Sequence, residues 1–283
     1  MKKIKEQGMR VVFFLSACVS VAAVALICVF LFANGMPAIG KIGALNFLLG
    51  TSWKPLNGIF GILPMIVGSI YVTAGAVVFG VPLGILTAVF MARYCPKRLY
   101  GILKPAVNLL AGIPSVVYGF FGLMVIVPAI RNAFAVSGAS MLAASLVLGI
   151  MILPTVIGIS EAAIRAVPAN YYEGSRALGA SNERSIFFAV LPAAKSGITA
   201  GVILGIGRAV GETMAVIMVA GNQAVMPTSV LKGLRTLTAN IVIEMGYSAD
   251  LHREALIATG VVLFVFILII NLMFSLVQRR NKV

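Results

Sequence analysis

Charged and metal-binding side chains are scarce in this 283-residue sequence. Charged residues make up 11% of it, and it holds eight acidic residues, one histidine and three cysteines. None of these side chains has the spacing of a metal site, and Cys18 and Cys28, about 15 Å apart along one expected helix, are too distant for a disulfide. Glu212 is the one acid inside an expected membrane span, and no histidine lies in one. An enzyme that works through paired acids and bases or a bound metal is therefore not indicated.

The sequence also lacks the Gly-x-x-x-x-Gly-Lys-Ser/Thr phosphate loop of a large class of ATPases. The chain is therefore not expected to hydrolyse ATP itself, and no bound cofactor is expected.

Hydrophobic residues, by contrast, make up 60% of the sequence, which is more than a soluble domain needs. Apolar runs of about 20 residues are long enough to cross a bilayer. They predict an all-α polytopic membrane protein with six transmembrane helices, at residues 11–33, 62–91, 101–130, 139–160, 193–221 and 255–277.

The net charge of +14 fits one orientation of these helices. Most of the 22 Lys and Arg residues fall on the side that holds both termini, among them Lys2 and Lys3 at the start and Arg279, Arg280 and Lys282 at the end. Because cytoplasmic segments are enriched in Lys and Arg, both termini are expected in the cytoplasm, with the chain in the plasma or inner membrane of a prokaryote. Membrane orientation explains the basic composition without a nucleic-acid partner.

A charged pair, Arg208 and Glu212, interrupts the apolar fifth span. A charge at the centre of a membrane helix costs about 2.5–3.5 kcal/mol on insertion scales, and it commonly marks a functional site. Gly197, Gly201 and Gly205 fall on the same helical face, and small residues four apart let helices pack closely. The pair is therefore expected to face protein. Two interpretations stay open: an i,i+4 ion pair that cancels its own charge, and a contact between Arg208 and a translocated solute.

The third expected span contains a proline, which predicts a bend. Pro114 lies at the centre of this span and predicts a bent helix in the protein interior. Ser115 and Tyr118 beside it are candidates to line a solute path, with helix packing as an equal alternative. Trp53, between the first two spans, is expected to be an interfacial anchor.

The expected cytoplasmic loop at residues 161–192 is amphipathic. A turn at 179–182 divides two short helical stretches, with Ser181 or Asn182 as the cap of the second. A helix that lies on lipid normally has a basic polar face, whereas acids and bases are mixed here. The loop is therefore expected to dock on a cytoplasmic protein.

This loop resembles the coupling motif of ABC-importer permeases, in which Glu-Ala-Ala is followed by Gly and then by Ile-x-Leu-Pro. The matching residues are Glu173, Gly174, Ser175, Gly179, Leu191 and Pro192. The motif departs at Gly174-Ser175, where the family has two alanines, and at Ala189, where it has Ile. The literal Glu161-Ala162-Ala163 does not fit, because Val167 stands where the motif needs Gly. The chain also resembles the PstC family of phosphate-importer permeases over about residues 45–277. The segments that carry this resemblance are residues 111–119, residues 207–216 and the segment from Trp53 to Gly68.

The resemblance implies a type I ABC importer (MetI-like) fold. It divides the chain into residues 1–61, a first helix with an extracytoplasmic segment, and residues 62–283, the transmembrane domain with its coupling loop. The implied partners are a second, PstA-like permease, a dimeric PstB-like ATPase that uses the ATP, and an external PstS-like phosphate-binding protein.

With phosphate as the implied solute, we expect Arg208 to contact it transiently. Glu212 would lower the affinity of Arg208 for the anion so that phosphate can be released, and Thr213, Ser115 and Tyr118 would lie along the same path. A sulfate or molybdate importer is an alternative, and an ion-coupled secondary transporter is a further one.

Overall fold

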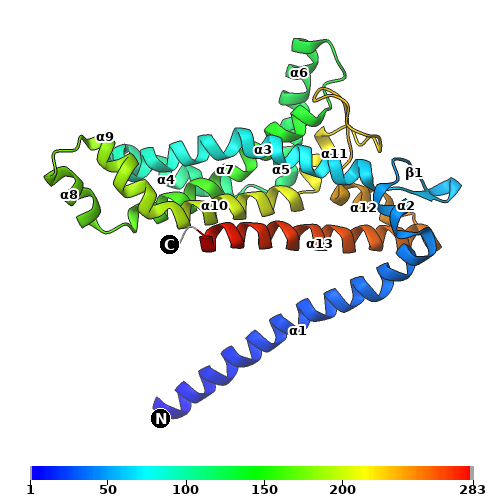
Figure 1. The fold of residues 1–283 in the computed structure, drawn as a ribbon, viewed down its shortest axis with the longest axis horizontal. Helices are drawn as coiled ribbons and strands as arrows, with labels where there is room; N and C mark the ends of the chain where they lie inside the picture. The colour runs from blue at the N-terminus through cyan, green and yellow to red at the C-terminus, as the bar shows by residue number, and fades with distance from the viewer. Residues whose placement is uncertain (1, 281–283) are drawn as a thin grey trace.

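The computed structural model is mainly helical, and it describes residues 2–280 (Figure 1). Lys282, one of the cations used above to orient the chain, lies outside the described residues. Within the described part, six segments are long and apolar enough to cross a membrane, which confirms the predicted number. They are Gln7–Ile42, Leu63–Tyr94, Ser115–Phe134, Met141–Arg165, Asn182–Gly211 and Asp250–Met273.

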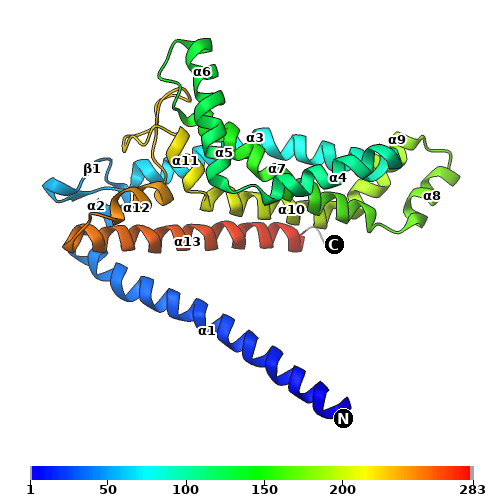
Figure 2. The same cartoon turned by 180° about the vertical axis from the view of Figure 1, so that it is seen from behind.

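The long helices of the body run side by side (Figures 1 and 2). They are α3 (Leu63–Val89), α7 (Met141–Arg165), α10 (Leu191–Gly211) and α13 (Asp250–Arg280). Helix α7 packs against both α3 and α10, and its side chains dominate the main apolar core. Close approach between α3 and α7 depends on glycine, since a Cβ added at Gly80 would lie 2.7 Å from the carbonyl oxygen of Gly149.

The first helix, α1 (Lys2–Ile42), diverges from this body (Figure 1). The C-terminal part of α1 contacts α13. There the rings of Phe32 and Phe264 meet edge to face, with 6.1 Å between their centroids. Most of its apolar side chains are exposed. An exposed apolar surface of this length needs lipid or another protein to cover it.

The third span begins later than predicted. Helix α4 (Lys97–Gly112) lies along α7, and the chain then becomes extended at Ile113 and Pro114. The apolar span follows as α5 (Ser115–Phe121), the π-helical turn η3 (Gly122–Ile126) and α6 (Val127–Phe134), which rise steeply from the body (Figure 1). The prediction of one helix over 101–130 is wrong because proline disfavours the helical conformation in the residue before it.

Short elements form the two ends of the body. At the end we call the coupling end lie η2 (Phe90–Tyr94), α8 (Ala169–Ala177), α9 (Asn182–Ser185) and η4 (Ile186–Val190). At the opposite end, the hairpin end, lie α2 (Ala44–Leu49), β1 (Trp53–Lys54), η1 (Pro55–Asn57), β2 (Ile59–Phe60), α11 (Met214–Val219) and α12 (Leu237–Met245) (Figure 1). Strands β1 and β2 are antiparallel, with Trp53 opposite Phe60.

Candidate translocation site

The predicted fifth span is broken beside its charged pair. Helix α10 ends at Gly211, Glu212 is extended with φ −71° and ψ 133°, and α11 begins at Met214. The prediction of an unbroken helix over 193–221 is therefore wrong at Glu212. The interpretation of Arg208 and Glu212 as an i,i+4 ion pair is wrong too: no such pair forms among the described residues, because Glu212 has left the helix.

Glu212 instead stabilises the break. Its carboxylate accepts a hydrogen bond from the backbone N–H of Ala215 at 3.1 Å, which satisfies one of the donors left unpaired at the start of α11. Its backbone carbonyl accepts a hydrogen bond from the Thr238 hydroxyl at 3.0 Å. Thr213 is half-buried in the same break, and its hydroxyl donates to the carbonyl of Gly211 at 3.3 Å.

Arg208 lies one turn before the break and is half-buried. Its Nη1 donates to the Thr155 hydroxyl of α7 at 3.4 Å, a long contact by the usual standard. No carboxylate pairs with Arg208 in the described part of the chain. Most of the guanidinium N–H donors are therefore available to another molecule, and no ion pair with a described residue neutralises the positive charge.

Of the two predicted residues on α5, Tyr118 is the one whose contacts place it in this region. Tyr118 is buried, donates its hydroxyl to the carbonyl of Leu110 at 2.8 Å, and lies within electrostatic range of Arg208. Helix α5 packs tightly on the start of α11, since a Cβ added at Gly119 would lie 2.8 Å from the Cα of Ala215. Ser115 is half-buried at the first turn of α5.

The glycine face of α10 packs as predicted. A Cβ added at Gly197 would lie 2.4 Å from the Cβ of Ala163, and Gly201 and Gly205 also face α7. The prediction of a helix-contact surface is confirmed, and Arg208 continues that surface through its contact with Thr155.

The coupling loop has the predicted turn. Gly179 has φ +84°, a conformation that favours glycine. Ser181, not Asn182, is the cap, since its hydroxyl accepts a hydrogen bond from the N–H of Arg184 at 3.2 Å. Asn182 accepts one from the Tyr172 hydroxyl at 2.9 Å.

The two halves of the coupling motif lie in different elements. Glu173 and Gly174 are exposed on α8, whereas the half-buried Leu191 and the exposed Pro192 lie in a helical segment that continues from Asn182 to Gly211. Beside the motif, Leu178 and Phe188 expose 91% and 79% of their surface. The loop thus presents apolar side chains at one end of the segment that carries Arg208 near its other end.

A buried carboxylate near this loop was missed by the sequence reasoning. Glu161 is 1% exposed and forms ion pairs with Lys104 at 2.6 Å and with Arg165 at 2.7 Å. It also accepts a hydrogen bond from the Tyr100 hydroxyl at 2.7 Å, which raises the pKa of Tyr100 above its ordinary value. The i,i+4 spacing of Glu161 and Arg165 was the available signal. The cluster ties α4 to the end of α7.

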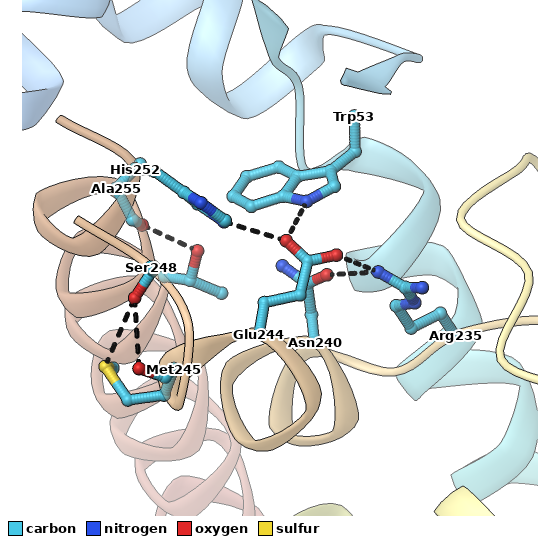
Figure 3. A network of polar contacts seen from close by, with 9 residues as sticks. Trp53, Arg235, Asn240, Glu244, Met245, Ser248, His252 and Ala255 are labelled. Carbon is cyan, nitrogen blue, oxygen red and sulfur yellow. Dashed lines mark hydrogen bonds and ion pairs between the residues drawn. The ribbon is translucent and has the colours of Figure 1, made fainter. Parts of the chain in front are cut away.

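A second buried carboxylate, Glu244 of α12, organises the hairpin end (Figure 3). It accepts a hydrogen bond from the indole N–H of Trp53 at 2.8 Å and forms an ion pair with Arg235 at 2.5 Å. His252, in the first turn of α13, lies 2.8 Å from the same carboxylate. The prediction of Trp53 as an interfacial anchor is wrong, because the residue is 7% exposed and its indole N–H is bonded inside the protein.

Comparison with known proteins identifies the type of molecule. Residues 80–283 match a family model described as binding-protein-dependent transport system inner membrane component. The chain belongs to this family. It is 37% identical to a probable ABC transporter permease protein, YqgH, of Bacillus subtilis, over 100% of this chain and 94% of that protein. It is 35% identical to the phosphate transport system permease protein PstC of Mesorhizobium japonicum, over 85% of this chain and 80% of that protein.

Solved structures confirm the fold. A chain of the MetNI methionine ABC transporter in an inward-facing conformation matches with a TM-score of 0.64 and 19% identity, over 82% of this chain and 100% of that chain. A chain of a bacterial alginate ABC transporter matches with a TM-score of 0.63 and 16% identity, over 95% and 96%. The predicted MetI-like permease fold is therefore confirmed, and the protein is a multi-pass membrane permease.

Proposed function

We propose that this chain is a permease subunit of an ATP-driven phosphate importer and that Arg208 contacts the passing phosphate. The observation that carries the proposal is an arginine that has no carboxylate partner among the described residues and lies one turn before a helix break, in a chain 35% identical to a PstC permease. The planar guanidinium is suited to an oxyanion. Family membership favours ATP-driven import over the ion-coupled alternative.

The geometry revises the role that the sequence suggested for Glu212. Its carboxylate caps α11, so we infer that it shapes the break and does not neutralise Arg208. The long Thr155 contact, and the lack of an ion pair among the described residues, leave the Arg208 guanidinium available to a passing phosphate. Thr213, Tyr118 and Ser115 are proposed to lie along the same path.

The partners follow from the two ends of the molecule. In this proposal the coupling end and both termini lie in the cytoplasm, where the exposed Leu178 and Phe188 and the motif residues Glu173 and Gly179 meet a dimeric PstB-like ATPase. The ATPase hydrolyses the ATP, and this chain binds no cofactor. A PstA-like second permease completes the path, and a PstS-like binding protein delivers phosphate at the hairpin end.

The test is uptake of radiolabelled phosphate into proteoliposomes that hold the complete transporter. We expect ATP-dependent uptake that unlabelled phosphate competes away and that sulfate and molybdate do not. Arg208→Ala should abolish uptake while the ATPase still co-purifies. Competition by sulfate or molybdate would show that the solute is another oxyanion and not phosphate. Retained uptake in Arg208→Ala would show that Arg208 does not contact the solute.

A further inference from the structure

Thr155 places a hydroxyl in the middle of the apolar segment Met141–Arg165. The residue is half-buried, and its oxygen accepts the hydrogen bond from Arg208. A threonine in a helix can donate its own proton to the carbonyl four residues earlier, as Thr87 and Thr259 do in this chain. The Thr155 hydroxyl donates to no acceptor among the described residues. Its proton is therefore available to another molecule.

The packing of α10 on α7 explains how Arg208 reaches this hydroxyl. Gly205 of α10 faces Val156 and Ile152 of α7. Arg208 comes almost one turn after Gly205, and yet its guanidinium contacts Thr155, which is next to Val156 in the chain. The arginine side chain therefore points back toward the beginning of α10, as side chains in helices do.

Glycine leaves open space beside this contact. Gly207 and Gly211 are exposed on α10, and Gly158 is half-buried on α7. A Cβ added at any of the three would meet no atom within 4 Å outside its own stretch of helix. Gly211 follows Arg208 by three residues, which puts both on one side of α10. Gly158 follows Thr155 by the same interval on α7, so the described part of the chain leaves room for a small ligand here.

Other hydroxyls proposed for the path differ from Thr155 in their contacts. Thr213 and Tyr118 each donate to a backbone carbonyl, so their protons are already used. Ser115 has no contact that places it beside Arg208. Thr155 thus combines a direct contact with Arg208 and a donor that is free among the described residues.

We propose that Thr155 is a second contact for the translocated oxyanion and donates its hydroxyl proton to one oxygen while Arg208 binds the charge. The proposal rests on the proposed function, because it adds a residue to the site assigned there to phosphate. A hydroxyl accepts and donates at the same time, so Thr155 can keep Arg208 in position while it binds the anion. One cation and one neutral donor orient an anion and hold it less strongly than two cations would. Such a site suits a ligand that must be passed on.

The first test measures phosphate uptake per ATP hydrolysed in proteoliposomes that hold the complete transporter. Thr155→Val removes the donor and should lower this ratio about fivefold, the effect of one lost hydrogen bond. Thr155→Ser keeps the donor and should match the unaltered transporter. Ser160→Ala is the control and should match it too, because Ser160 is fully buried on the same helix and its hydroxyl has no partner among the described residues. Equal ratios for Thr155→Val and Thr155→Ser, or an equal loss in Ser160→Ala, would overturn the proposal.

A second test covers the case in which Thr155→Val fails to assemble. Thr155→Cys is placed in a chain whose native cysteines are replaced by Ser, and the complete transporter is held in nanodiscs. We expect a water-soluble thiol reagent to modify this cysteine and added inorganic phosphate to slow the reaction. Ser160→Cys, at a fully buried position, should stay unmodified.

The outcomes of this second test separate the Thr155 contact from the identity of the solute. No modification of Thr155→Cys, or modification that neither phosphate nor sulfate slows, would overturn the contact. If uptake were still lost in Arg208→Ala, the proposed function would then stand without Thr155. Slowing by sulfate and not by phosphate would refute phosphate as the solute and leave the Thr155 contact standing.

Discussion

The Thr238 hydroxyl donates to the backbone carbonyl of Glu212 at 3.0 Å and so holds the start of α12 against the break between α10 and α11. The break frees backbone carbonyls that a continuous helix would pair. Inside a membrane these groups must find partners within the protein. Thr238 supplies one from a helix that is remote in sequence.

Replacing Thr238 with Val should remove this hydrogen bond while keeping a β-branched side chain of similar shape. We expect a stability loss of about 1 kcal/mol and slower phosphate uptake, because the break next to Arg208 loses a partner. Thr238→Ser, which keeps the hydroxyl, is the matched control and should transport normally. Equal uptake by the Val and Ser variants would show that the hydrogen bond has no part in transport.

Glu212 variants distinguish a capping role from a neutralising one. Glu212→Gln keeps an oxygen that can accept from Ala215, so we expect near-normal thermal stability and uptake. Glu212→Ala removes the acceptor and should cost about 1 kcal/mol. If Glu212→Gln were as impaired as Glu212→Ala, the carboxylate charge and not the cap would be the important property.

Glu161 should be important for stability at the coupling end. Removing one member of a fully buried ion pair costs about 3–5 kcal/mol. Lys104 and Arg165 remain partly in solvent, so we expect about 2 kcal/mol for Glu161→Leu. Tyr100→Phe removes one hydrogen bond and should cost about 1 kcal/mol. Thermal unfolding of the purified complex measures both, and a smaller loss for Glu161→Leu than for Tyr100→Phe would contradict the central role of Glu161.

Crosslinking tests the coupling loop as the ATPase contact. In a chain whose native cysteines are replaced by Ser, cysteines at Ser175 and Gly179 should form disulfides with cysteines on the ATPase. Gly101→Cys, at an exposed position of α4, is the control and should not. If no position from Glu173 to Gly179 formed a crosslink with the ATPase, this part of the loop would not be the ATPase contact.

Hydrophobic periodicity and motif spacing were sufficient to predict the main features of the architecture. The number of spans, the glycine face against α7 and the turn at Gly179 all depend on local sequence, and all were predicted. The break at Glu212 was not, because no proline marks it and one of the hydrogen bonds that stabilise it comes from Thr238, 26 residues later. Residues remote in sequence also decide the burial of Trp53, which depends on Glu244.

Hydropathy misplaced the third span for a different reason. Helix α4 is apolar enough to merge with the span that follows it, and only the backbone at Ile113 and Pro114 separates them. The roles proposed for Arg208, Glu173 and their neighbours remain predictions that the experiments above address.

The continuous helical segment from Asn182 to Gly211, formed by α9, η4 and α10, would act as a lever arm in the proposed transporter. At 1.5 Å per residue, Arg208 lies about 39 Å from the beginning of the segment. A tilt of about 5° applied at the coupling end would then displace Arg208 by about 3 Å. That displacement is close to the full length of the 3.4 Å contact with Thr155. A small movement of the proposed ATPase partner would thus be sufficient to give the arginine a different set of neighbours.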